Sequence, residues 1–529
     1  MKINKLFLIG AVALGLGFTA CSNNDDLDGS SPEGKEANTN VSVTLNLTSK
    51  GSVKALPDDY NRIGEWAGKD KIEKVAIYLV DGSTVSTNLF TVGSGADDGY
   101  TQEAVNASNQ VVLKPKKAIK TSSGIKKVYV LINGTSAVES ALSSTSAATF
   151  EDAYKTAALA LANSGTNLTV ATSADNIAVK NGVTDETIVM TNVEEVTINV
   201  APNVKEEDAL RDASPLNRAS VSVERAVARV MVTTASDTYQ IKSGSDVLGT
   251  ISNITWVLAQ GENSLYVQRK ADWTTPNYGW VPADNTEYIA SAQSKYDYSG
   301  LFESYDAATQ FGGTAVATMA DYATNPSGNV NAELDAKLSG KFVLPTTHVA
   351  TADETSGYKK GNTAYVLVRS KFAPAKYADN APANADGTFY VGANGKFYTS
   401  AANALDATKG GVAGQTVAKY VNGKVLYYAW VNPNNVPNWY NSPVIRNNVY
   451  HVHITGFKNL GTNWNPLYPE DPGTSDPKNP DPKPSTPDVT EPENPIDPTD
   501  PLTTPETWMS VDVKVLPWTV HSYAIDLGI

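Results

Sequence analysis

Apolar residues alternate with polar ones in many short runs of this 529-residue chain, and this pattern restricts the possible folds most. A period of two gives a β-strand one apolar and one polar face. The clearest run is residues 41–47, where Val41, Val43, Leu45 and Leu47 alternate with Ser, Thr and Asn. Gly, Pro or Ser bound most of the runs. The pattern predicts a mainly β fold with short helical insertions.

The strand-like runs form two groups on either side of a polar stretch at residues 212–218. The first group is at residues 41–47, 74–80, 110–113, 127–132, 188–190 and 196–200, and the second at 221–233, 251–258, 340–344, 363–371, 424–431 and 448–454. A chain of this length exceeds what one core usually supports. We therefore expect two β-sandwich domains, at residues 55–218 and 219–465.

One stretch of the first group has helical signals. Thr149 is a candidate N-cap, residues 150–161 form the expected body of the helix, and Gly165 is the expected stop. This segment is the helical insertion that we expect in the first domain.

Residues 466–507 differ sharply in composition, because 13 of the 28 prolines of the chain lie there. Their spacing with Asp, Glu, Asn and Thr favours an extended, polyproline-like conformation that cannot bury a core of its own. We expect this Pro-rich linker to act as a spacer or as a strap.

Residues 508–529, beyond the linker, return to a strand pattern. Two segments alternate on either side of Pro517, and such an interruption suits the edge of a sheet. Their apolar and aromatic residues are Met509, Val511, Val513, Val515, Trp518, Val520, Tyr523, Ile525 and Leu527. An isolated ribbon is marginal in water, so these strands must dock on a sheet of their own chain or of a neighbouring copy.

The first 20 residues have the form of a signal peptide: a basic start with Lys2 and Lys5, an apolar stretch too short to span a bilayer, and a small-residue cleavage site. Cys21, the only cysteine of the chain, follows directly. This pattern resembles a bacterial lipobox, with Phe18 where Leu is usual. We expect lipidation at Cys21, export through the periplasm and anchoring in the outer membrane through the lipid.

Charge and composition exclude several classes of function. The formal net charge of −14 argues against nucleic acid as a partner. A single cysteine leaves no disulfide framework and no Cys-based zinc site in the mature chain.

His451 and His453 fall on one face of a strand, but no third ligand is near them in sequence, so we interpret them as ordinary strand residues. No phosphate loop or nucleophile elbow is present. We predict no enzyme activity, no cofactor and no metal.

Several sequence segments along the whole chain resemble the fimbrillin that builds the minor, or short, fimbriae of Porphyromonas, a type V pilin of the Bacteroidales. The segments are residues 64–75 (GEWAGKDKIEKV), 181–188 (NGVTDETI), 223–229 (VERAVAR), 424–430 (KVLYYAW), 463–469 (NWNPLYP) and 515–518 (VLPW). The resemblance implies two transthyretin-like β-sandwich domains in a structural subunit that mediates adhesion and biofilm formation. It also implies a homopolymer in the fimbria, with accessory tip and anchor subunits and host or bacterial receptors as further partners.

The resemblance further implies maturation by an arginine-specific protease, a gingipain. Such cleavage removes the strand at residues 41–47, and a donor strand within residues 508–529 of another subunit takes its place. Lys54 stands where the family has its cleaved arginine, and the first arginine of this chain is Arg62. If a lysine-specific protease takes the place of the arginine-specific one, cleavage follows Lys54, so that the propeptide is residues 21–54 and Ala55 is the new N-terminus. Cleavage after Arg62 would instead extend the propeptide to that residue, with Ile63 as the new N-terminus. Either cut would release the strand at residues 41–47.

A monomeric surface lipoprotein that binds glycans is the alternative hypothesis. In that interpretation Trp256, Trp273, Trp280 and Tyr266 stack on sugar rings, and the Pro-rich linker acts as a strap. Ordinary core and surface aromatics also explain these four residues.

Overall fold

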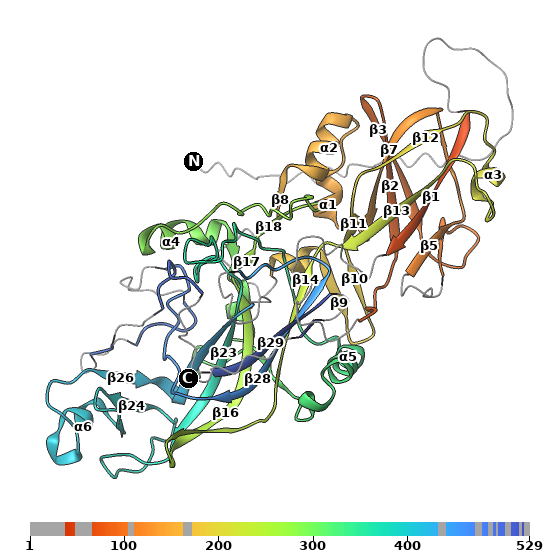
Figure 1. Ribbon diagram of the computed structural model, residues 1–529. Helices are drawn as coiled ribbons and strands as arrows, with labels where there is room; N and C mark the ends of the chain where they lie inside the picture. Colours follow the sequence, from red (N-terminus) through yellow and green to blue (C-terminus); the bar gives the residue numbers. More distant parts are fainter. Residues whose placement is uncertain are drawn as a thin grey trace, which may run out of the picture.

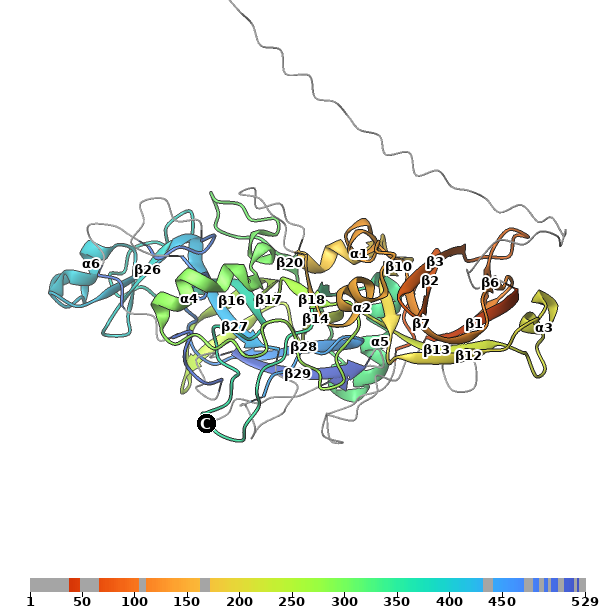
Figure 2. The same cartoon turned by 90° about the horizontal axis from the view of Figure 1, so that it is seen from above.

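The computed structural model describes residues 38–47, 66–103, 111–161, 172–431, 441–470, 479–484, 490–492, 496–502, 509–517 and 521–522. These residues fold into two β-rich bodies that follow one another along the molecule (Figures 1 and 2). The predicted mainly β fold with sandwich domains and short helices is therefore confirmed. In the described part of the chain, no helix is both long and apolar enough to cross a membrane.

The first body is built on a curled sheet of ten strands, in the order β3-β2-β7-β11-β13-β1-β5-β4, with β12 paired to β7 and β6 paired to β1. Its strands are β1 (Thr39–Leu47), β2 (Lys74–Asp81), β3 (Thr84–Thr91), β4 (Tyr100–Gln102), β5 (Val111–Pro115), β6 (Ile119–Thr121), β7 (Gly124–Ile132), β11 (Met190–Asn192), β12 (Val196–Val200) and β13 (Arg218–Arg225). Around it lie α1 (Ser136–Ala141), α2 (Ala147–Lys155), η1 (Ser173–Asn176), α3 (Glu206–Leu210) and the hairpin β9 (Ala178–Asn181) and β10 (Asp185–Ile188).

Strand β2 shows how this sheet buries both of its faces. Val75, Ile77 and Leu79 point into the core enclosed by the curled sheet. Ala76, Tyr78 and Val80 point to the opposite face, which α1 and α2 cover. Alternation with a period of two thus supplies two different cores from one strand.

The helix predicted at residues 150–161 is shorter and starts earlier in the structure. Ser146, rather than Thr149, occupies the N-cap position of helix α2, and the helix ends at Lys155. The chain then extends into β8 (Ala158–Ala160), which pairs with β18 (Ser264–Tyr266) of the second body. Tertiary strand pairing therefore overrides the helix propensity of this alanine-rich segment. The predicted stop, Gly165, lies outside the described residues.

The second body is a sandwich of two facing sheets, in the orders β21-β14-β28-β29 and β15-β16-β23-β27. Its strands are β14 (Ala228–Thr234), β15 (Tyr239–Ser243), β16 (Asp246–Ala259), β20 (Thr314–Ala315), β21 (Ala317–Thr318), β22 (Lys341–Val343), β23 (Tyr365–Pro374), β27 (Lys424–Trp430), β28 (Asn448–Phe457), β29 (Met509–Pro517) and β30 (His521–Ser522). A core of apolar residues from β14, β16, β23, β27 and β28 fills the space between the sheets.

Smaller elements decorate this sandwich. They are the strands β17 (Gly261–Glu262), β19 (Tyr296–Asp297), β24 (Phe389–Gly392), β25 (Phe397–Tyr398) and β26 (Val417–Tyr420), the helices α4 (Asn285–Ser291), α5 (Pro326–Lys337) and α6 (Ala401–Leu405), and the 3₁₀ turns η2 (Ala292–Ser294), η3 (Ser299–Phe302), η4 (Tyr322–Thr324), η5 (Ala407–Lys409) and η6 (Val421–Gly423). Figure 2 shows α6 and β26 at the end of the molecule farthest from the first sheet.

The chain passes from the first sheet to the second at Ala226 and Val227. Strand β13 pairs with β1 and β11 in the first sheet, although most of its residues fall in the range 219–465 that we assigned to the second domain. The next strand, β14, pairs with β28 in the second sheet. The expected run at residues 221–233 is thus two strands in two sheets.

The Pro-rich linker lies against the second body where it is described. Leu467, Tyr468, Ile496 and Leu502 are buried in an apolar cluster of that body. The apolar residues between the prolines therefore pack on a surface that the sandwich provides and do not form a separate core. Of the two alternatives, spacer or strap, the described parts form a strap.

Candidate functional site

Strand β1 is the candidate functional element, and it lies inside the first sheet rather than at its edge. It runs parallel to β13, with Ser42 opposite Arg218 and Leu47 opposite Val223. On its other side it runs antiparallel to β5 and β6, where Leu45 lies opposite Leu113. Both rows of its backbone hydrogen-bonding groups therefore have neighbouring strands.

The apolar face of β1 lies in the core of the first body. Val41, Val43 and Leu45 are fully buried, and Leu47 is nearly so. Burial of such a side chain is worth roughly 1.5–3 kcal/mol. The four predicted residues thus face the core together. Removal of β1 would therefore leave an apolar groove between β13 on one side and β5 and β6 on the other. This space is called the β1 groove below.

Polar side chains also hold β1 in the groove. The hydroxyl of Tyr100, on β4, donates a hydrogen bond to the carbonyl of Val43 across 3.0 Å. Burial raises the pKa of Tyr100 far above its usual value, so the hydroxyl remains a donor at any physiological pH. Asn217 donates from its side-chain amide to the carbonyl of Asn40 across 3.1 Å. The groove therefore recognises backbone atoms of its strand as well as apolar side chains.

The predicted donor strand pairs with its own second body. Strand β29 runs antiparallel to β28, with Val511 opposite Ile454 and Val513 opposite Val452, and lies at the end of its sheet order. Figures 1 and 2 show β29 away from β1. The short strand β30 also pairs with β28, at His521 and Ser522. Trp518, Val520, Tyr523, Ile525 and Leu527 lie outside the described residues.

The processing sites predicted from the sequence are also outside the described part of the chain. These are the lipidation site Cys21 and the cleavage positions Lys54, Ala55, Arg62 and Ile63. They remain predictions.

The two histidines of β28 contact Thr233 and Tyr322. His451 Nε2 and His453 Nδ1 both lie within hydrogen-bond distance of the hydroxyl of Thr233, at 2.7 and 2.8 Å. Both rings are buried against Tyr322. In the described ranges, no three His, Cys, Asp or Glu side chains are grouped to hold a metal ion.

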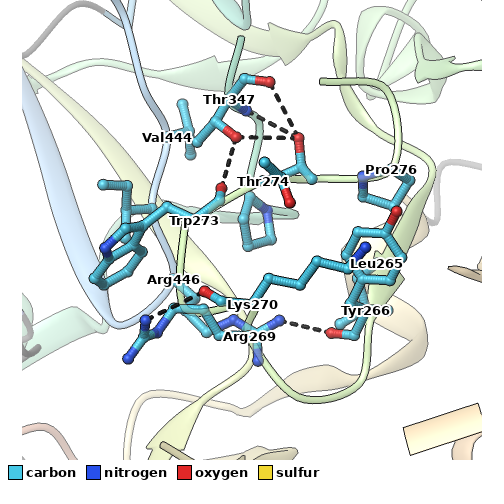
Figure 3. Close-up of a pocket in the computed structure, with 13 residues that line it drawn as sticks. Leu265, Tyr266, Arg269, Lys270, Trp273, Thr274, Pro276, Thr347, Val444 and Arg446 are labelled. Atoms are coloured by element: carbon cyan, nitrogen blue, oxygen red, sulfur yellow. Dashed lines mark hydrogen bonds between the residues drawn. The ribbon is translucent and has the colours of Figure 1, made fainter. Parts of the chain in front are cut away.

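The four aromatic residues of the glycan hypothesis do not form one platform. Tyr266 and Trp273 line a small pocket of about 20 Å³ (Figure 3). Lys270 lies 3.7 Å from the ring centre of Tyr266, and Arg269 lies 3.8 Å from that of Trp273, so cations of the same chain cover one face of each ring.

The other two tryptophans lie elsewhere. Trp256 is buried in the core of the second sandwich. Trp280 packs against Tyr296 in a different apolar cluster. The structure therefore offers no shared stacking surface made of all four rings.

Comparison with known proteins identifies the family. The family model for the C-terminal part of fimbrillin, described as major fimbrial subunit protein type IV, matches residues 418–524. The minor fimbrium subunit Mfa1 of Porphyromonas gingivalis is 34% identical over 549 residues, covering 99% of this chain and 100% of that protein. The chain belongs to the minor fimbrium subunit family. It is accordingly a structural subunit of a fimbria and not an enzyme.

Solved structures of two fimbrial proteins from Porphyromonas gingivalis also match this chain. The fimbrilin FimA of Porphyromonas gingivalis has a TM-score of 0.42 and 12% identity, covering 92% of this chain and 99% of that one. The tip fimbrial protein Mfa3 has a TM-score of 0.32 and 9% identity, covering 79% and 96%. The assignment to the minor fimbrium subunit family rests on the full-length relative and not on these two structures.

Sequence reasoning found the apolar face of β1 but missed its polar contacts. Tyr100, Asn217 and Arg218 come from segments far away in the sequence, so no local pattern connects them with β1. On β1 itself, Thr39 and Ser42 are buried polar residues. The spacing of these two hydroxyls recurs near the C-terminus, so the sequence did contain a signal that could have pointed to these polar residues.

Proposed function

We propose that this fimbrial subunit is exported as a lipoprotein and polymerises by strand exchange. In this proposal Cys21 carries the lipid, and a protease such as a gingipain cuts after Lys54 or Arg62. The cut frees the segment that contains β1. The C-terminal strand of a second copy then fills the β1 groove, and repetition of this step builds a filament that mediates adhesion and biofilm formation, with tip and anchor subunits at its ends.

The position of β1 is the observation that carries the proposal. A strand near the start of the chain lies between two other strands and places four apolar residues in the core. Its removal would uncover apolar surface and two rows of unpaired backbone groups, which favour the addition of another strand. Burial of four apolar side chains of a donor strand would contribute roughly 6–12 kcal/mol before ordering costs.

The place of the donor strand in its own chain supports exchange on energetic grounds. At the end of its sheet order, β29 has β28 as a neighbour on one side. In the β1 groove the same segment would have strands on both sides and a complete apolar core beneath it. Transfer from an edge position to a central position therefore adds backbone hydrogen bonds and buried area, and both favour the polymer.

A protease experiment tests the proposal. The purified precursor is mixed with a trypsin-like protease, and unboiled samples are run in SDS. We expect a ladder of SDS-resistant multimers. A variant lacking residues 508–529 should be trimmed equally and remain a folded monomer. If the trimmed full-length protein also stays monomeric, the strand-exchange proposal is wrong and a monomeric surface lipoprotein becomes the better hypothesis.

Mass spectrometry of assembled material tests the maturation step separately. We expect an N-terminus at Ala55 or Ile63. A lipidated Cys21 retained in every subunit of the filament would contradict removal of β1.

A further inference from the structure

Two buried hydroxyl groups fix β1 in register within its groove. The first belongs to Thr39, which is fully buried. Its hydroxyl donates to the carbonyl of Ala201 across 2.7 Å and accepts from the backbone N–H of Val204 across 3.0 Å. A strand residue without a hydroxyl at this position would leave both backbone groups without these partners.

The second hydroxyl belongs to Ser42, which is 1% exposed although it lies on the face of β1 opposite the apolar core. It donates to the carbonyl of Ala209, the buried residue of α3, across 2.7 Å. It also accepts from Nε of Arg218 across 2.9 Å. This position therefore requires a small side chain that can donate and accept at the same time.

The same pair of hydroxyls recurs at the C-terminus with the same spacing. Thr39 and Ser42 are three residues apart, as are Thr507 and Ser510. Aligned on these hydroxyls, Met509, Val511, Val513 and Val515 fall on Val41, Val43, Leu45 and Leu47. Thr507 lies outside the described residues, so this match is one of sequence.

We propose that the donor segment of a second copy enters the β1 groove in one register, with Ser510 in the place of Ser42 and Thr507 in the place of Thr39. This inference rests on the proposed strand exchange and specifies it. Ala209 and Arg218 then act as the register-determining contacts of the groove, because they accept from and donate to the incoming hydroxyl.

The neighbouring registers fail at these polar positions. A slip of two residues one way puts Asp512 at the Ser42 position, where a carboxylate cannot donate to the carbonyl of Ala209. It also puts Met509 at the threonine position. A slip of two residues the other way puts Trp508 at the enclosed serine position, where α3 leaves no room for an indole ring. A slip of one residue exposes the apolar face.

The last strand segment of the chain carries the same spacing but fits the core poorly. Thr519 and Ser522 are also three residues apart. In that alignment His521 falls on Val41 and Tyr523 falls on Val43, both of which are fully buried in the apolar core. A polar ring and an oversized ring at valine positions are each destabilising. The segment that starts at Thr507 is therefore the better donor.

Cysteine pairs test the register. Val112, on β5, is the antiparallel partner of Asn46. In the proposed register Lys514 takes the place of Asn46. We would combine Val112→Cys with Lys514→Cys in a Cys21→Ala background, start assembly with protease, oxidise mildly and boil in SDS without reductant. Covalent multimers are expected.

Three matched cysteine pairs serve as controls for this cross-linking experiment. Val112→Cys with Asn46→Cys should form an intramolecular disulfide in the uncut precursor, which shows that the two positions permit the bond. Val112→Cys with Asp512→Cys reports the two-residue slip that would put Trp508 at the serine position. Val112→Cys with Asp526→Cys reports entry of the last strand segment of the chain. Neither of these two pairs should cross-link the multimers.

The outcomes separate the register from the proposed function. If the protein without these substitutions forms no SDS-resistant ladder, strand exchange itself fails. If the ladder forms but the Asp512 or Asp526 pair cross-links instead, or no donor pair does while the precursor control succeeds, the register is wrong and strand exchange survives.

A substitution without cysteines provides a second measurement. Ser510→Ala removes the hydroxyl that Ala209 and Arg218 would bind, so the ladder formed in a fixed time should fall roughly fivefold. Asp512→Asn, at an outward position in the proposed register, should leave it unchanged. Equal behaviour of the two variants would overturn the assignment of Ser510.

Discussion

At the scale of single residues, a buried carboxylate holds the Pro-rich strap to the second body. Asp481 accepts from Arg369 and Lys424 across 2.8 and 2.9 Å, and all three side chains are buried. Burial alone would raise the pKa of Asp481, but the two cations outweigh it and hold the pKa below its usual value. The strap is thus bound by charge as well as by apolar contacts.

We predict that Asp481→Asn lowers the free energy of unfolding by about 3–5 kcal/mol, because two buried cations lose their counter-ion. Denaturant titration of the purified precursor measures it. Asp497→Asn, on an exposed part of the same strap, should change the value by less than about 0.5 kcal/mol. Similar losses in both variants would mean that the Asp481 ion pairs do not hold the strap.

His348 makes the second body sensitive to acid. Its Nε2 lies 2.9 Å from the carbonyl of Asn362, and burial lowers the pKa of the imidazole from 6.5 to about 4. The folded state therefore disfavours the charged ring. The resulting stability is fully present above about pH 6.5 and is lost as the pH falls towards 4.

We predict that the precursor loses about 3 kcal/mol more stability between pH 7 and pH 4 than a His348→Gln variant does. Denaturant titrations of both proteins at a series of pH values measure the difference. Parallel pH profiles would show that His348 does not titrate with a lowered pKa.

At the scale of elements, β1 contributes to the stability of the precursor, and the donor segment contributes to the stability of the polymer. In the proposed mechanism the two segments occupy the same groove at different times. Substitutions in them should therefore act on different states of the protein, although both concern the same core.

We predict that Leu45→Ala lowers the stability of the precursor by about 2–5 kcal/mol through a core cavity, yet leaves assembled multimers unchanged, because β1 is no longer present. Val513→Ala should have the opposite effect. It should weaken the multimers, in which Val513 of the donor segment fills the β1 groove, and leave the first body of the precursor intact. Thermal dissociation of ladders and denaturant titration of precursors measure the two effects. Multimers weakened by Leu45→Ala would contradict the removal of β1.

At the scale of the whole molecule, the two bodies share a core. One apolar cluster contains Phe150 and Ile188 of the first body together with Met231 and Val449 of the second. Beside it, the fully buried Arg229 of β14 forms an ion pair with Glu186 of β10. Such an interface is apolar and enclosed, so the bodies should resist independent motion.

We therefore predict one cooperative unfolding transition for both bodies of the precursor. Glu186→Gln should shift the whole transition downward, because Arg229 loses its buried partner, whereas the exposed Glu194→Gln should not. Calorimetry combined with limited proteolysis measures this. Two separate transitions, with one of them insensitive to Glu186→Gln, would contradict a shared core.

The sequence by itself was enough for the β class, the apolar face of β1 and the presence of strands at the C-terminus. These are local properties, because alternation with a period of two is set by strand geometry alone. The assignment to a fimbrial subunit also came from sequence segments, and the full-length relative confirms it.

Only the tertiary structure decided which strands are neighbours and where polar groups meet. It placed β1 between β13 and β5, divided residues 221–233 between two sheets, ended helix α2 at Lys155 and bound the strap through Asp481. Each of these depends on contacts between residues far apart in the chain, and the burial and hydrogen bonds of such contacts outweigh local propensity.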